Sequence, residues 1–77
     1  MSTAFNEVVI HLDETVDDEM LGDLEQDIRQ APGVVSVGHR PRQQHLLMVV
    51  YDTAAARGAG LLRPFSERGL HAQLVGL

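Results

Sequence analysis

Apolar side chains alternate with polar ones along residues 5–12, where Val8, Ile10 and Leu12 fall at every second position. A period of two is typical of a strand that buries one face. Val9 lies on the other face of this strand and indicates that this second face is not fully polar. The segment 5–12 therefore predicts a strand with its stronger apolar face toward a core.

Three further segments have the composition of strands. Residues 34–39 read as a short strand, and the following 40–43, which contain Pro41, read as a turn. Residues 44–52 include an apolar run on both faces, which predicts a central strand covered on both sides. Residues 70–77 predict a last strand whose core-facing positions are Leu70, Ala72 and Leu74.

A helical period follows the first strand. Either Thr15, in a capping box with Asp18, or Asp17 can cap this helix, and acids in the first turn favour the positive end of its dipole. Pro32-Gly33 is expected to end it. The apolar positions at helical spacing are Met20, Leu21, Leu24, Ile28 and Ala31.

Residues 53–68 favour a second helix, but a poor one. Gly58, Gly60 and Pro64 all oppose a regular helix, while Leu61, Leu62 and Phe65 supply an apolar stripe. We therefore expect a short or kinked helix, well formed only toward its C-terminal half.

The predicted order is βαββαβ. Right-handed crossovers convert this order into a four-stranded antiparallel sheet of strand order 4-1-3-2, with both helices on one face. This is the α+β, ferredoxin-like architecture. At 77 residues the chain is expected to form one domain, residues 1–77, with a small core.

Composition excludes several functional classes. The net charge of −5 disfavours nucleic acid as a partner, and the sheet face away from the helices is expected to lack the aromatic residues of an RNA-recognition sheet. No apolar run is long enough for membrane insertion, and the first residues lack the basic region of a signal peptide, so we expect a soluble cytoplasmic protein. Neither a Ser-His-Asp group nor a convincing pair of acids is present, so we expect no enzyme.

Four short motifs carry a resemblance to one family. They are Pro32-Gly33-Val34, Val49-Val50-Tyr51-Asp52, Leu61-Leu62 and Gly69-Leu70-His71-Ala72. In order and spacing the chain resembles the heavy-metal-associated domain, the module of copper chaperones and of the N-terminal regions of metal-pumping ATPases. The resemblance covers nearly the whole chain, with one extra residue near Pro41, and implies a ferredoxin-like fold and a role in metal handling or metal transport.

The resemblance breaks at the metal motif. The family pattern is Gly-Met-x-Cys-x-x-Cys after the first strand, and on this register Asp17 and Met20 stand at the two cysteines. The chain has no cysteine, and a cuprous ion prefers two soft thiolates. The resemblance therefore implies a scaffold without thiolate ligands, in which Asp17 and Met20 are weak candidates for metal ligands. A helix cap and a core residue are the plainer interpretations.

Histidines offer a second candidate metal site. The expected topology brings His11, His39, His45 and His71 to the end of the domain that carries the acidic loop, and His11 and His71 to one sheet face as possible cross-strand neighbours. Two imidazoles with carboxylates suit nickel, cobalt, zinc or cupric ion. The alternative is that all four are separate, solvated surface histidines.

The sheet face without helices is a candidate interface. Its apolar positions are expected to be contiguous across three strands, and a monomer seldom leaves such a patch in water. Scattered apolar exposure is the alternative. We expect a homodimer or another protein partner on this face, at Val9, Leu46, Met48, Val50 and Val75.

Two functional hypotheses follow. The first is a small binding domain without thiolate ligands, either linked to metal handling or recruited as a protein-interaction module. The second is a divergent metallochaperone that binds a divalent metal through histidine and carboxylate ligands.

Overall fold

A computed structural model describes residues 4–76 of the chain. Four strands, one long helix and two short helical segments make up the fold. In chain order they are β1 (Phe5–Leu12), α1 (Asp18–Gln30), β2 (Val34–Gly38), β3 (Leu46–Asp52), the 3₁₀-helix η1 (Gly58–Leu62), α2 (Arg63–Ser66) and β4 (Ala72–Gly76).

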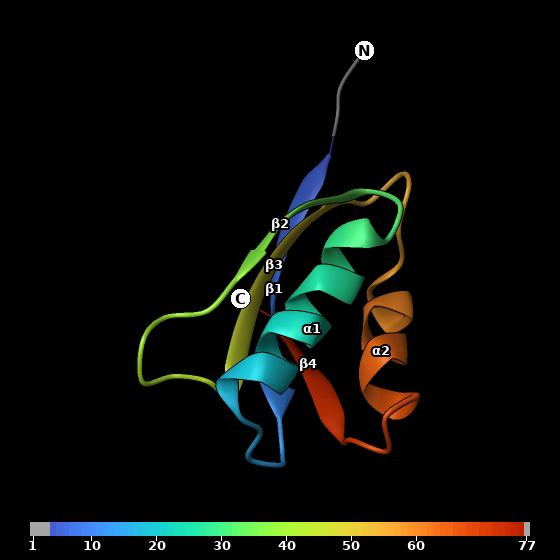
Figure 1. Cartoon of the computed structure of the whole chain (residues 1–77). Coiled ribbons are helices and arrows are strands. Elements are labelled where there is room, and N and C mark those ends of the chain that lie inside the picture. The colour runs from blue at the N-terminus through green and yellow to red at the C-terminus, as the bar shows by residue number, and fades with distance from the viewer. Residues whose placement is uncertain (1–3, 77) are drawn as a thin grey trace.

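The strands form one antiparallel sheet in the order β2-β3-β1-β4. Both helices lie on the same side of this sheet, and the loop after β1 and the turn before β4 lie at the same end of the molecule (Figure 1). The expected strand order and the ferredoxin-like architecture are confirmed. Within residues 4–76 no helix covers the other side of the sheet, and we call it the open face.

Helix α1 has the caps that its sequence favours. The Asp17 side chain accepts a hydrogen bond of 2.8 Å from the Met20 backbone N–H, so Asp17 rather than Thr15 caps the helix. After the C-cap, Gly33 takes a φ of +85°, and a Cβ there would lie 2.9 Å from the Ala55 Cβ. Glycine is therefore required at this turn for both its backbone conformation and its small size.

The second helical region is as short as expected. Residues 53–55 form a turn, η1 is a 3₁₀-helix, and α2 has a single turn that begins at Arg63 with Pro64 in its first positions. Phe65 anchors this turn, with 1% of its surface exposed.

The core lies between the helices and the sheet. One expectation needs correction: β3 is covered on one face only, since burial alternates along it. Leu74 pairs with the buried Ile10 and therefore lies on the helix side of the sheet as expected, although it is 37% exposed on the edge strand β4. The buried residues are Val8, Ile10, Leu12, Leu21, Leu24, Ile28, Leu47, Val49, Tyr51, Leu61 and Phe65.

Candidate functional site

The end of the molecule that carries the loop after β1 is the first candidate site. We call residues 13–17 the apical loop. The backbone N–H of Asp13 donates to the carbonyl oxygen of His71 at 2.9 Å, which joins the loop to the chain just before β4. The predicted proximity of His71 to the acidic loop is therefore present.

Glu14 and His71 are joined at two points. One carboxylate oxygen of Glu14 accepts the backbone N–H of His71 at 2.7 Å, and the other accepts the His71 Nδ1–H at 2.5 Å. The backbone hydrogen bond, followed by the side-chain one, lowers the pKa of Glu14 below its ordinary value of 4.5. The hydrogen bond to Glu14 and its charge raise the pKa of His71 above 6.5. We call this pair of contacts the Glu14–His71 clamp.

His11 does not stand directly opposite His71. Its partner on β4 is Gln73, and His71 lies two positions earlier in the chain, just before β4 begins at Ala72. The two histidines, expected as possible cross-strand neighbours, are therefore not paired directly across the sheet. The Nδ1 of His11 lies 3.4 Å from an oxygen of Asp13, and about half of each side chain is exposed.

The other two histidines have separate partners. His39 Nδ1 donates to the Glu25 carboxylate at 3.1 Å, and His45 Nδ1 donates to the Leu12 carbonyl at 3.1 Å. Within residues 4–76, no group of three or more histidine, aspartate and glutamate side chains is arranged to hold a metal ion. The topology brings the histidines to neighbouring segments, but their partners differ.

Asp17 and Met20 both have structural roles at the start of α1. Asp17 caps the helix through the Met20 N–H, and Met20 is half-buried and packs against the core. These are the plainer interpretations that the sequence offered. A ligand role for either residue is untested and stays a prediction.

The open face is the second candidate site. Met48 lies opposite Val9 of β1, and Val9 lies opposite Val75 of β4, so the three residues form a row across the sheet. Leu46 and Val50 flank Met48 along β3, and all but Val75, which is 46% exposed, are half-buried. The five apolar residues are therefore contiguous on one surface.

Two shallow hollows interrupt this surface, and Met48, Glu7 and Arg40 line both of them. Met48 therefore lies between an acidic and a basic side chain. Phe5 is 59% exposed. Because alternate residues of a strand share a face, it lies on the same side of β1 as Glu7 and Val9, which is the open face. The expectation that this face has no aromatic residue was wrong.

Sequence reasoning missed two features of these sites. It treated Glu14 as one acid among several, although the pairing of Leu12 with Ala72 places Glu14 beside His71 once the register is known. It also left Arg40 in a turn, without a place on the open face. The position of Arg40 after β2 was the available signal, because β2 pairs with β3 at Met48.

Comparison with known proteins gives structural matches alone. No family model matches the chain, and no curated protein does. Among the described residues, no helix is long and apolar enough to cross a membrane.

Several solved structures share the fold. Oxidized MerP from Ralstonia metallidurans CH34 has a TM-score of 0.80 at 15% identity, covering 92% of this chain and 97% of MerP. The copper-binding domain of HMA7, a P-type ATPase, has a TM-score of 0.80 at 13% identity, and the match covers 92% of this chain and 95% of that domain. The copper chaperone of Enterococcus hirae, in its apo form, has a TM-score of 0.76 at 15% identity, and the match covers 88% of this chain and 98% of the chaperone. These similarities confirm the expected resemblance at the level of the fold.

Proposed function

We propose that this chain is a binding domain built on the fold of metal-handling proteins, and that it associates through its open face with a second copy of itself. The observation that carries the proposal is the contiguous apolar surface centred on Met48. Fold neighbours described as a copper chaperone and a copper-binding domain support a link to metal handling.

The distribution of charge supports association through the open face. Eight of the eleven acidic residues lie between Asp13 and Asp27, in the apical loop and along α1, whereas the open face has few charges. Two copies that meet face to face would therefore keep most of their negative charge apart. The net charge of −5 gives only weak opposition to such a dimer.

The borders of the open face favour a self-complementary contact. In a two-fold dimer each surface patch meets itself, so a residue on one side of the axis faces a residue on the other. Glu7 and Arg40 line the hollows around Met48 and carry opposite charges. Glu7 of one copy can therefore pair with Arg40 of the other while the two Met48 side chains pack at the centre.

Hydrophobic burial is sufficient in principle. A contact of this kind could bury several hundred Å² of apolar surface per chain, and at about 25 cal/mol per Å² that gives several kcal/mol before association costs. The result is a dimer of moderate affinity, formed at micromolar or higher concentrations.

Dilution followed by NMR tests this proposal residue by residue. On dilution, the amide resonances of Val9, Met48 and Val75 should shift together along one binding curve. Those of Leu21 and Leu24 in α1, on the other side of the sheet, should stay fixed. Concentration-independent spectra would contradict a dimer, and shifts confined to α1 would contradict this interface.

One observation favours divalent metal binding as a second candidate function. Metal-binding histidines usually have one ring nitrogen fixed by a carboxylate, which leaves the other free for the metal. His71 Nδ1 contacts Glu14 and His11 Nδ1 is near Asp13, so both Nε2 atoms remain available. Nickel, cobalt, zinc or cupric ion would suit two such imidazoles.

Calorimetry with nickel or zinc tests this second candidate. If both histidines are ligands, His11→Ala and His71→Ala should each weaken binding strongly, and the double variant should abolish it. His45→Ala is the matched control, because His45 donates to a backbone carbonyl and should leave binding unchanged. Equal titration curves for all variants would contradict a site at His11 and His71.

A further inference from the structure

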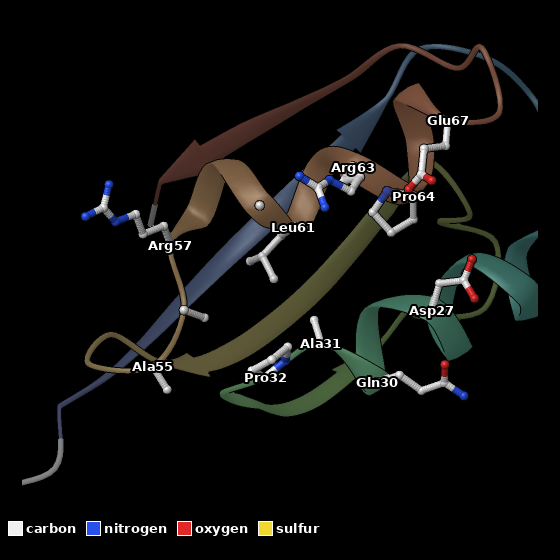
Figure 2. Close-up of a pocket in the computed structure, with 12 residues that line it drawn as sticks. Asp27, Gln30, Ala31, Pro32, Ala55, Arg57, Leu61, Arg63, Pro64 and Glu67 are labelled. Carbon is white, nitrogen blue, oxygen red and sulfur yellow. The ribbon is translucent and has the colours of Figure 1, made fainter.

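A groove between α1 and the η1–α2 segment is distinct from both sites above. It has a volume of about 480 Å³, within the range of about 300–1,000 Å³ typical of small-molecule sites. One wall is the end of α1, at Asp27, Gln30 and Ala31, and the other is the η1–α2 segment (Figure 2). We call it the helix groove. It lies on the helix side of the sheet, away from the open face.

The helix groove exists because small residues occupy the segment before α2. Ala55, Ala56 and Gly60 line it, and their small or absent side chains leave the space unfilled. A Cβ built on Gly60 meets no atom within 4 Å, so the space beside it is open. The weak second helix that the sequence predicts therefore leaves a cavity instead of a closed helix pair.

One part of the helix groove is apolar. Ala31 and Pro32 on one wall and Pro64 on the other form this part, over Leu61, which is only 2% exposed (Figure 2). These groups give a ligand no hydrogen bonds but can cover a compact hydrocarbon body.

The rim of the helix groove carries two arginines. Arg57 caps η1 and Arg63 begins α2, and neither makes an ion pair with any residue between 4 and 76. Of the two acids on the rim, Asp27 already pairs with Arg68 at 2.6 Å, and Glu67 lies one helical turn after Arg63, beside Pro64 (Figure 2). The rim therefore offers two unengaged guanidinium groups in a protein of net charge −5.

We propose that the helix groove binds a small monocarboxylate with a compact apolar body. Arg63 receives the carboxylate, because a guanidinium group matches a carboxylate through two parallel hydrogen bonds. Pro32 and Pro64 cover the apolar part.

An NMR titration with hexanoate tests the charge and the place of binding together. Saturable shifts are expected at residues 27–32 and 55–64, with a dissociation constant on the order of a millimolar, as for a small ligand. Hexanamide keeps the apolar body but lacks the charge, and it should bind about tenfold more weakly. Equal binding of the two compounds, or no saturable shift with hexanoate, would overturn the proposal.

Two pairs of variants fix the site. Arg63→Gln should weaken hexanoate binding about tenfold, whereas Arg42→Gln, which removes the same charge from a distant turn, should not. Gly60→Leu should fill the groove and abolish binding, whereas Gly22→Leu, at an exposed site on α1, should not. If Gly60→Leu fails to fold, the comparison of Arg63→Gln with Arg42→Gln still tests the position of the site. Equal losses in Arg63→Gln and Arg42→Gln would overturn the assignment.

Discussion

Glu14 binds His71 through both of its carboxylate oxygens, one on the backbone N–H and one on the imidazole Nδ1. The two residues are 57 positions apart in the sequence, and their contact fixes the apical loop against the start of β4. The resemblance drawn from the sequence aligns this end of the fold with a metal motif of two cysteines, and this chain has no cysteine. Here the same end is held by an internal hydrogen-bonded ion pair.

The clamp predicts a specific pH dependence of stability. The pKa of Glu14 is lowered, so its contribution is present above about pH 4.5 and is lost as the pH falls through the folded-state pKa. The pKa of His71 is raised, so its contribution is full below about pH 6.5 and is lost as the pH rises through the folded-state pKa. The clamp should therefore stabilise most between about pH 4.5 and 6.5.

Glu14→Gln measures this effect directly. The variant removes the charge and keeps an oxygen for the His71 backbone N–H. An NMR titration of the His71 ring should give a lower pKa in Glu14→Gln than in wild type. Urea unfolding should show the largest difference in stability between the two proteins within that pH window. An unchanged His71 pKa in the variant would contradict the clamp.

Tight cuprous binding should be absent. The chain has no cysteine, and Asp17 and Met20, which stand at the two cysteine positions of the family motif, cap and pack the start of α1. In a competition assay the protein should leave copper on a strong cuprous chelator. Removal of the metal from the chelator by the wild-type protein would refute this prediction.

Two glycines should respond differently to alanine. Gly22 is an exposed residue of α1 with open space at its Cβ position, so Gly22→Ala should stabilise the fold by about 0.5–1 kcal/mol. A Cβ on Gly58 would lie 2.9 Å from the Leu74 Cδ1, so Gly58→Ala requires Leu74 to move and should gain less or destabilise. Thermal unfolding of both variants compares their stabilities. A larger gain in stability from Gly58→Ala than from Gly22→Ala would contradict the prediction.

Protection from hydrogen exchange should be lowest around η1. This segment has 3₁₀ geometry, two glycines and only one turn of α-helix after it, whereas β1 and β3 pair along most of their length. Amides of residues 58–66 should therefore exchange faster than those of Val8 or Val49. Uniform protection throughout the chain would contradict this prediction.

The fold could be predicted from the sequence because its signals are local and consistent. The period of two in β1, the helical spacing of Leu21, Leu24 and Ile28, and the glycines of the second helical segment each act within a few residues. Given these elements, the handedness of the crossovers leaves few sheet orders. The alternation of side chains along each strand also indicated which residues face the open face.

The contacts at the sites could not be predicted in the same way. A period-two pattern leaves the register of β4 against β1 free to shift by two residues, and this register decides whether His11 faces His71 or Gln73. Glu14 was hidden among several acids for the same reason. The helix groove depends on how far η1 and α2 lie from α1, which no local pattern encodes.

Sedimentation velocity of wild type and Met48→Asp tests whether the chain dimerises through its open face. Met48 lies at the centre of the open face, and the new carboxylate would be buried without a partner in a dimer, which is strongly unfavourable. The core residues Leu47 and Val49 point to the other side of β3, so the variant should still fold. Ser66→Asp, which adds the same charge on α2, is the control.

We expect wild type and Ser66→Asp to sediment as concentration-dependent dimers, and Met48→Asp to be a folded monomer at every concentration. Wild type that stays monomeric at high concentration, or a Met48→Asp variant that dimerises as wild type does, would contradict association through the open face.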